Sequence, residues 1–515
     1  MAERSERRSE PVAGRDPVAG REPVIVVGAG SAGAVVAARL AAAAVPVLLV
    51  EAGPDHDAAA TPPAIAGPNF FAACTDAYLW QGLDGRRTPS QAPRRYLRGR
   101  VVGGCSAVNA MVGLWAAPAD HDAPGWPASL GWAATAARRA AIERRLPLWR
   151  PPLAAWSPVE QALAVAAQDA GHRWCDDHHA AGAVGVEGIG VGPAALTVRD
   201  GRRVSVNEGY LEPVRSSGYL TVRGGAEVAA LVFDGRRACG VRLTDGTELA
   251  ARRVVVAAGA INSPVLLLRS GVSVAGVGEG LGDHPSAPVT LVLRPAGRLE
   301  HPDRYVVNSL LRYSSGLVAG DDGVADMQVL TIAAVGAGPQ DLGVAVAQAA
   351  VMRSFSRGRV SIDAAGAPVL DFRLLDDERD RLRLRDGVRR LVGLCRHPAM
   401  TAVTEAVVLN GLDGSTGAGA LTGGDIDALL ADDGALDGWL TANTGDYVHA
   451  CGTCRMGPAG APGAVVDPFD GAVHGYEALH VIDASVLPDV PRANTHLITV
   501  LVAEVLADGL LARCS

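Results

Sequence analysis

Lysine is missing from this sequence of 515 residues, in which all 47 basic residues are arginine. Its absence excludes reactions that proceed through a lysine Schiff base and phosphate-binding loops that need a lysine. A basic surface is missing as well, because 55 acidic residues against 47 arginines give a formal net charge of -8. The sequence therefore predicts no nucleic-acid partner.

Cysteine is scarce, and long apolar runs are interrupted. Eight cysteines in 515 residues are too few for a disulfide scaffold. The N-terminal segment MAERSERRSE is charged and no apolar run follows it, so no secretory signal is predicted. The apolar stretch 32–50 is broken by Arg39 and Pro46, and no segment is expected to span a membrane. These absences predict a soluble, cytoplasmic protein.

The rest of the composition is that of a globular protein with more than one core. Hydrophobic residues make up 49% and charged residues 20% of the chain, and 515 residues suffice for two domains. The first 22 residues differ, because PVAGR occurs at 11–15 and again at 17–21 without apolar periodicity. We expect residues 1–22 to form a disordered tail, with a docking peptide as the alternative.

A strand–helix–strand unit is predicted directly after this tail. PVIVVG at 23–28 is a short apolar, β-branched run that ends in glycine, as a buried parallel strand does. An alanine-rich helix follows over 31–44, and PVLLVE at 46–51 predicts the second buried strand. Together these segments form one βαβ unit of about thirty residues.

The turn of this unit reads Gly-x-Gly-x-x-Gly, which favours a bound dinucleotide. Gly28 permits the tight turn, Gly30 lets a pyrophosphate approach the backbone, and Gly33 lets the helix pack closely on the strand. The helix N-terminus offers free N–H groups to the phosphates. Glu51, at the end of the second strand, can accept hydrogen bonds from both ribose hydroxyls, which argues against a 2′-phosphate. The motif does not distinguish FAD from NAD.

The remaining chain divides into a completion of this α/β domain and an inserted second domain. Further strands of the first domain are predicted at 219–223, 228–233, 240–243, 253–257 and 479–483. A last helix is expected over about 496–512, capped by Asn494 or Thr495.

Between about 286 and 430 the pattern changes. The alternating segments 289–294, 325–332 and 358–363 predict an antiparallel sheet, and the charged stretch 376–396 predicts a helix. We interpret the region 116–160, which lacks clear periodicity, as loop and short helix that covers the cofactor.

Residues 99–111 read GRVVGGCSAVNAM and resemble the glucose–methanol–choline (GMC) oxidoreductases, FAD-dependent enzymes that oxidise alcohols. The resemblance spans residues 23 to 512 and includes four further blocks in the family's order. These blocks are GAINSPVLLLRSG at 259–271, DHP at 283–285, HACGTCRMG at 449–457 and VIDASVLP at 481–488. The chain departs from the family at Cys105, Gly113 and Ser273, none of which matches a catalytic position.

The resemblance implies an α/β fold in which a Rossmann-like FAD-binding domain is interleaved with an antiparallel-sheet (α+β) substrate-binding domain. The expected boundaries are 23–285 for the first part of the FAD domain, 286–429 for the substrate domain and 430–515 for the completion of the FAD domain. The residues expected to bind FAD are Gly28, Gly30, Ser31, Ala32, Gly33, Glu51, Ala52, Val102, Gly103, Gly104, Asn109, Ala110, Val228, Asp483, Ala484 and His496. In some members the residue before Asn109 is a histidine bonded to the flavin; here it is Val108, so non-covalent FAD is expected.

The resemblance also implies the catalytic residues. His449 matches the family's base, which removes the hydroxyl proton while hydride passes to the flavin, and His496 lies where the family's second active-site residue, Asn or His, belongs. Cys451 and Cys454 form a single pair that provides two of the four ligands of a zinc site, so packing is favoured over metal or dithiol chemistry and no metal is expected.

The function implied is FAD-dependent oxidation of a primary or secondary alcohol. One alternative is a compact dehydrogenase that reoxidises or uses a specialised electron carrier, since residues 190–213 look like compact actinobacterial members, including those associated with mycofactocin. Another is a non-redox flavoprotein, either a lyase or a scaffold. The sequence identifies neither the alcohol nor the electron acceptor, which could be oxygen, a quinone or a carrier.

Overall fold

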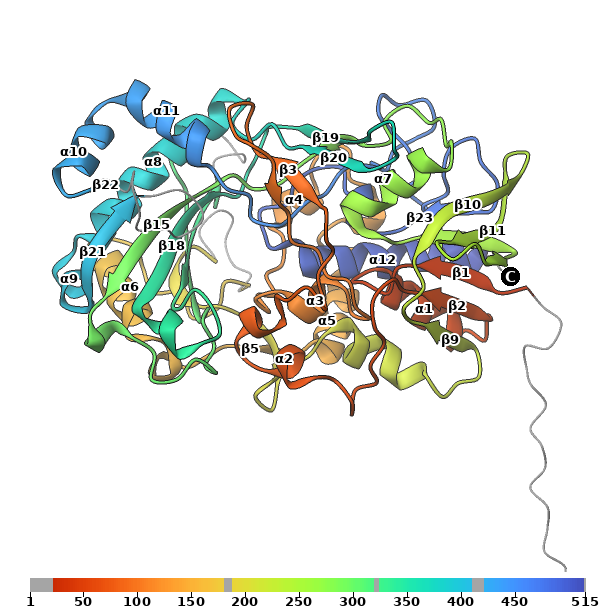
Figure 1. Cartoon of the computed structure of the whole chain (residues 1–515), viewed down its shortest axis with the longest axis horizontal. Coiled ribbons are helices and arrows are strands. Elements are labelled where there is room, and N and C mark those ends of the chain that lie inside the picture. The colour runs from red at the N-terminus through yellow and green to blue at the C-terminus, as the bar shows by residue number, and fades with distance from the viewer. Residues whose placement is uncertain (1–21, 180–187, 319–323, 410–420, 514–515) are drawn as a thin grey trace, which may run out of the picture.

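The structure is a computed structural model that describes residues 22–179, 188–318, 324–409 and 421–513. The predicted disordered tail lies outside these residues except for Glu22. The described chain forms two halves, with the parallel sheet on the right and the large antiparallel sheet on the left of Figure 1.

The right-hand half is built on a five-stranded parallel sheet. Its strands, in spatial order, are β23 (Leu479–Val481), β13 (Arg253–Val256), β1 (Val24–Val27), β2 (Val47–Val50) and β9 (Leu220–Arg223). All four neighbouring pairs are parallel, and the valine-rich strands are buried because helices cover the sheet. The predicted parallel strands are therefore confirmed.

Three helices belong to this half: the first packs on the parallel sheet, the second on the neighbouring strand β10 (Val228–Asp234), and the third on the first helix. They are α1 (Gly33–Ala42), α7 (Gly259–Arg269) and α12 (Thr495–Ala512). A separate antiparallel sheet contains β10 (Val228–Asp234), β11 (Arg237–Leu243) and β12 (Glu248–Ala250).

Helix α12 is the predicted last helix, with Asn494 as its N-cap residue. It is long and apolar enough to cross a membrane, but 67% of it is buried inside the molecule, as in a core helix. Figure 1 shows that α12 ends near the C-terminus at the right edge and begins between the two halves. The start of α12 is therefore placed at the junction of the two halves.

The left-hand half contains a seven-stranded antiparallel sheet. Its strands, in spatial order, are β22 (Leu421–Thr422), β21 (Thr404–Leu409), β15 (Ser286–Leu293), β18 (Val344–Val351), β17 (Met327–Ile332), β16 (Ser309–Tyr313) and β6 (Gly190–Pro193). Helix α8 (Glu378–Cys395), which the sequence predicts, packs on its central strands. Helices α6 (Pro158–Asp169) and α9 (Pro398–Val403) pack on each other beside α8, and α10 (Gly424–Ala431) and α11 (Asp433–Asn443) lie at the outer edge (Figure 1).

The division between the halves is more interwoven than the expected boundary at 285/286. Strand β6 comes from before this boundary yet pairs with β16 in the antiparallel sheet. The segment 358–363, which we expected in the large antiparallel sheet, forms β19 of a different sheet. That sheet has the order β14 (Glu279–Leu281), β19 (Gly358–Ile362), β20 (Pro368–Asp371), β3 (Asp84–Arg86) and β4 (Arg94–Arg95).

The region 116–160 contains short elements and one longer helix. They are α4 (Pro118–His121), η2 (Ala128–Leu130), α5 (Ala136–Arg145), β5 (Leu148–Trp149) and η3 (Leu153–Ala155). Helix α5 packs on α12, and none of the residues 116–160 lines the cavity described below. The structure thus places the larger part of this region against the core of the first half, whereas Trp149, Trp156 and Val159 pack into the core of the second half.

The other short elements lie between these helices and strands in the chain. They are α2 (Pro63–Ala66), η1 (Phe70–Ala73), α3 (Cys105–Val108), β7 (Leu196–Arg199), β8 (Arg202–Arg203), the π-helical turn η4 (Asn207–Leu211), η5 (Glu212–Val214), η6 (Pro295–Gly297), η8 (Pro339–Gly343) and η9 (Ala484–Val486).

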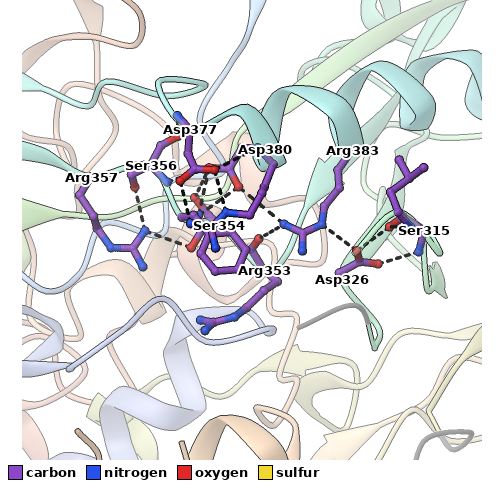
Figure 2. Close-up of polar contacts among 12 residues, drawn as sticks. Ser315, Asp326, Arg353, Ser354, Ser356, Arg357, Asp377, Asp380 and Arg383 are labelled. Carbon is purple, nitrogen blue, oxygen red and sulfur yellow. Dashed lines mark hydrogen bonds and ion pairs between the residues drawn. The ribbon is translucent and has the colours of Figure 1, made fainter. Parts of the chain in front are cut away.

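A buried ion network fixes α8 to the antiparallel sheet (Figure 2). The Arg383 side chain on α8 is fully buried, pairs with Asp326 at 2.8 Å and donates to the carbonyl of Arg353 at 3.0 Å. Asp326 also accepts hydrogen bonds from Ser315 at 2.7 and 2.6 Å. Asp380 on the same helix accepts from backbone amides at 355 and 356. The segment 353–357 is therefore held on the helix by charged groups out of contact with water.

Candidate active site

A cavity of about 810 Å³ lies between the two halves. It starts at the carboxyl ends of β1 and β13, where the strand order of the sheet reverses and ligands of doubly wound sheets bind. It extends to the antiparallel sheet. The predicted site residues in its lining are Gly28, Gly30, Ser31, Ala32, Glu51, Ala52, Gly104, Asn109, Ala110, Val228, His449, Asp483, Ala484 and His496.

Two glycine-rich loops meet at one end of the cavity. Gly28 has a φ of 96°, and a Cβ atom there would lie 2.6 Å from the carbonyl oxygen of Ala257. Gly104 has a φ of 51°, and its Cβ would lie 2.5 Å from the Cα of Gly30. The two loops can therefore approach this closely only because glycine, which has no side chain, occupies these positions.

Three of the expected FAD-binding residues are absent from the cavity lining, namely Gly33, Val102 and Gly103. Gly33 has the expected packing environment, because a Cβ there would lie 1.9 Å from the carbonyl oxygen of Gly28. The amide of Gly103 donates to the carbonyl of Ala29 at 2.9 Å and so ties the second glycine loop to the first. Gly33 and Gly103 therefore lie outside the cavity lining and pack against the residues that form it.

Glu51 follows β2, and its carboxylate lies in the cavity wall. The carboxylate accepts hydrogen bonds from the amides of Ala29 at 2.8 Å and Gly53 at 2.9 Å. Burial raises the pKa of Glu51, and the two amides oppose that shift. Each carboxylate oxygen has a further acceptor position, so ribose hydroxyls can still bind.

Asp283 organises the opposite end of the cavity from behind. Its buried carboxylate accepts hydrogen bonds from the Tyr96 hydroxyl at 2.7 Å and from the amides of His284 at 2.7 Å and His449 at 3.1 Å. Burial and the nearby Asp446 raise the pKa of Asp283 to about 6, so it is ionised at neutral pH. A charged acceptor therefore anchors the backbone of both histidines.

The residue before His449 has an unusual backbone conformation. Val448 has a φ of 56°, a region that β-branched residues rarely adopt. Its amide donates to Asp446 at 3.0 Å and its carbonyl accepts from Arg98, so both sides of the peptide are restrained. Such a conformation persists only where the surroundings impose it, and here it directs the following histidine.

His284 and His449 are bonded to each other through their rings. The two Nδ1 atoms lie 2.9 Å apart, and Nε2 of His284 lies 2.9 Å from the carbonyl oxygen of Pro491. Because a carbonyl can only accept, Nε2 of His284 carries a proton, and neutral His284 accepts at Nδ1. The proton between the rings then belongs to Nδ1 of His449. This assignment leaves Nε2 of His449 as an unprotonated acceptor.

The side chain that meets this acceptor is Asn494. Its Nδ2 lies 3.2 Å from Nε2 of His449, and its Oδ1 is buried with no hydrogen-bond partner among the described residues. His496 instead lies beside the nucleotide loop, with Nδ1 3.1 Å from the hydroxyl of Ser31. The structure therefore does not pair the two predicted catalytic histidines.

All three of these histidines are held in the neutral form. Burial, together with His284 and Arg98, lowers the pKa of His449 well below its usual value. Burial lowers the pKa of His284 to about 4, and burial with Arg203 lowers that of His496 to about 4. At neutral pH the site thus offers imidazole lone pairs.

Asp283, His284 and His449 also lie close enough to suggest a metal site, since their donor atoms are within 4.8 Å of one another. These atoms are already engaged in hydrogen bonds. The two rings are bonded to each other through Nδ1, and the carboxylate accepts from the Tyr96 hydroxyl and from backbone amides. We therefore interpret the cluster as a hydrogen-bond network.

Cys451 and Cys454 are free thiols in the hydrophobic core, in keeping with a packing role. Burial raises the pKa of both thiols, so neither is a thiolate at neutral pH. Cys105 lines the cavity, and its sulfur accepts a hydrogen bond from the amide of Gly99 at 3.4 Å.

The cavity fits a long dinucleotide that reaches from the glycine loops to the histidines. Nε2 of His496 is buried in the lining without a partner among the described residues, which suits a polar atom of a bound flavin. A doubly wound sheet with such a cavity, ending at neutral imidazoles, defines a class: FAD-dependent oxidoreductases that act on CH–OH groups. The chain belongs to the GMC oxidoreductase family, whose N- and C-terminal domain models match residues 23–286 and 354–503. The resemblance seen in the sequence is confirmed.

Several known proteins are similar over nearly the whole chain. The 5-(hydroxymethyl)furfural oxidase of Methylovorus sp. (strain MP688) is 31% identical, with 95% of this chain and 98% of that protein covered. The oxygen-dependent choline dehydrogenase of Photobacterium profundum is 28% identical, with 95% and 93% covered. The crystal structure of pyridoxine 4-oxidase from Mesorbium loti has a TM-score of 0.79 at 25% identity, with 96% and 99% covered. The expected α/β fold is confirmed by this likeness.

Proposed function

We propose that this protein oxidises a primary or secondary alcohol to an aldehyde or ketone, with His449 as the base. FAD supplies the hydride acceptor, so the substrate gives a hydride to the cofactor and a hydroxyl proton to the protein. The observation that carries the proposal is the chain from Pro491 through His284 to His449, which leaves Nε2 of His449 unprotonated. An imidazole in this state is suited to accept a hydroxyl proton.

The residues around His449 can accommodate the positive charge that proton transfer creates. Protonated His449 still donates from Nδ1 to neutral His284, and the Asp283 carboxylate lies against the backbone of both. Asn494 would exchange its contact with Nε2 for the substrate hydroxyl, whose oxygen can accept a hydrogen bond from Nδ2 while its proton points to Nε2 of His449. We assign Asn494 the second active-site position that the sequence suggested for His496.

His496 and the glycine loops are assigned to the cofactor. The His496 ring contacts Ser31 at the start of α1, and α12 begins one residue before it. A helix N-terminus stabilises negative charge nearby, which suits the reduced flavin. Glu51 would bind the ribose at the other end of the cavity.

The test is anaerobic flavin reduction followed by stopped flow with an alcohol that reduces the wild-type enzyme. We expect His449→Ala to slow reduction by about 10²–10⁴-fold while FAD remains bound, because a positioned base contributes on this scale. The control is His301→Ala, an exposed histidine, which should reduce at the wild-type rate. A wild-type rate in His449→Ala would disprove the base assignment.

Two further variants separate the roles of Asn494 and His496. Asn494→Ala should slow reduction without changing FAD content, and His496→Ala should lower FAD content more than the rate in loaded enzyme. The reverse pattern would restore His496 as the second catalytic residue.

FAD attachment is proposed to be non-covalent, because Val108 lines the cavity where some family members carry a linking histidine. We expect acid precipitation to release all flavin into the supernatant, which absorbance at 450 nm measures. Yellow precipitate that survives washing would contradict this, and peptide mapping would then identify the attachment residue, starting with Cys74 and Cys105 in the lining.

A further inference from the structure

The antiparallel sheet contributes an ordered wall to the cavity. Three adjacent strands, β15, β18 and β17, each place two residues in the lining. The strand register aligns these residues in two rows, which are Pro288–Gln348–Leu330 and Thr290–Val346–Ile332. Residues two apart on a strand face the same side, so all six side chains face the cavity. We call these six residues the sheet wall.

The sheet wall adjoins the histidines. Ser286, at the start of β15, exchanges backbone hydrogen bonds with Gly445 at 2.9 and 2.8 Å, and His284 lies two residues earlier. The row of Gln348 lies two residues further along the strands than Ser286, or about 7 Å. The side chains of the sheet wall are therefore placed to contact the part of the substrate that does not react.

The sheet wall is uncharged, and its character is mainly aliphatic. Phe70 and Phe71, which also line the cavity, add two stacked rings with centroids 4.3 Å apart. The carboxylate nearest in sequence to His449, Asp446, is already bonded to Arg87 at 2.6 Å. A cationic substrate would thus lose its hydration without gaining a free counter-ion, which is costly.

Gln348 provides a specific polar contact within this wall. It lies at the centre of the first row, is only partly buried, and its side-chain amide has no hydrogen-bond partner among the described residues. Its amide offers two donors and an acceptor. Leu330 and Pro288 flank it, so a ligand group that meets the amide would be surrounded by apolar surface.

We propose that the substrate is an uncharged alcohol with an apolar body and a second hydrogen-bonding group, and that Gln348 recognises this second group. The inference rests on the proposed alcohol oxidation. Gln348 is a specificity-determining residue, because it contacts the remote end of the substrate while His449 acts on the hydroxyl. Alcohols that carry a quaternary ammonium group are excluded by the uncharged wall.

The test compares substrates in anaerobic stopped flow, with rate constant and Kd obtained separately from the concentration dependence. The probes are benzyl alcohol, the 3- and 4-isomers of hydroxymethylbenzaldehyde, and choline. We expect at least one hydroxymethylbenzaldehyde to bind about tenfold more tightly than benzyl alcohol, the scale of one hydrogen bond. Gln348→Leu should remove this advantage, so that the hydroxymethylbenzaldehyde and benzyl alcohol have similar Kd values in this variant. Gln168→Leu, at an exposed position on α6, is the matched control and should behave as wild type.

A second variant keeps the proposal testable if Gln348→Leu folds poorly. Gln348→Glu adds a negative charge to the wall and should increase the rate of flavin reduction by choline relative to benzyl alcohol. The inference is overturned if choline outperforms benzyl alcohol in the wild type, or if the hydroxymethylbenzaldehyde advantage is absent in the wild type or survives in Gln348→Leu. If no alcohol reduces wild-type flavin, the proposed function itself fails.

Discussion

The carboxylate of Glu51 joins the first glycine loop to the segment that follows β2. It accepts from the amides of Ala29 and Gly53 and still faces the cavity. We expect Glu51→Ala to weaken FAD binding by about 10–150-fold, since hydrogen bonds to a charged group contribute about 1.5–3 kcal/mol. Titration of apoprotein with FAD measures this, and Glu248→Ala, an exposed carboxylate on β12, is the control. Full affinity in Glu51→Ala would show that the ribose binds elsewhere.

The sequence predicted which residues line the cavity where one motif contains both the residue and the physical reason for it, as for Gly28, Gly30 and Glu51. That these residues bind FAD stays a prediction. The bond between His284 and His449 joins residues 165 positions apart, so only the fold can bring them together. The segment Asn494-Thr-His496 contains both an asparagine and a histidine, and the start of α12 decides which of these two meets His449. The sequence identified Asn494 only as a helix cap.

The secondary-structure elements were predictable where their hydrophobic pattern was strong. The buried parallel strands and the charged helix α8 agree with the sequence. Strand β6 reads GVGP, a composition that central strands avoid, and it was not predicted. The segment of β19 has a strand pattern, but a pattern does not state which strand will pair with it, and it joined a different sheet.

Helix α8 provides the prediction at this scale. Replacing Arg383 by Met leaves the Asp326 carboxylate buried without its cation (Figure 2). Breaking a buried pair typically costs about 3–5 kcal/mol, so we expect Arg383→Met to lower the urea midpoint clearly. Arg381→Met on the same helix should change it little, because Arg381 is not fully buried. Equal midpoints for the two variants would mean that the network contributes no stability.

The whole molecule carries several buried neutral histidines, which makes its stability depend on pH. Burial lowers the pKa of His178, His284 and His496 to about 4 each. In the unfolded chain these imidazoles titrate near the usual value of about 6.5, so the unfolded state binds more protons between these values. The contribution of these histidines to the free energy of unfolding is therefore fully present above about pH 6.5. It is lost as the pH falls towards 4, by up to roughly 3 kcal/mol per histidine.

Asp283, with its pKa raised to about 6, acts in the opposite direction below that pH, and so do the buried carboxyls of Glu51, Glu160, Asp380 and Asp483, whose pKa values burial also raises. On the other side, burial also lowers the pKa of His179, His449 and His480. Urea unfolding followed by circular dichroism at pH 7.5, 6.5, 5.5 and 4.5 tests the balance. We expect equal midpoints at the two higher values and falling midpoints at the two lower ones. A midpoint that rises on acidification would mean that carboxylates govern the pH dependence.

The sheet wall has a consequence for how this protein can evolve. Its six side chains come from three paired strands, whereas the histidines and glycines come from other segments. Point substitutions at alternate strand positions can therefore change which alcohol is accepted and leave the redox chemistry intact. An insertion of one residue in β18 would instead turn the β18 residues beyond it to the other face, so that its wall residues point into the core and their neighbours into the cavity. Lineages that acquire new substrates on this scaffold should thus differ by substitutions in these strands and by length changes in the loops beyond them.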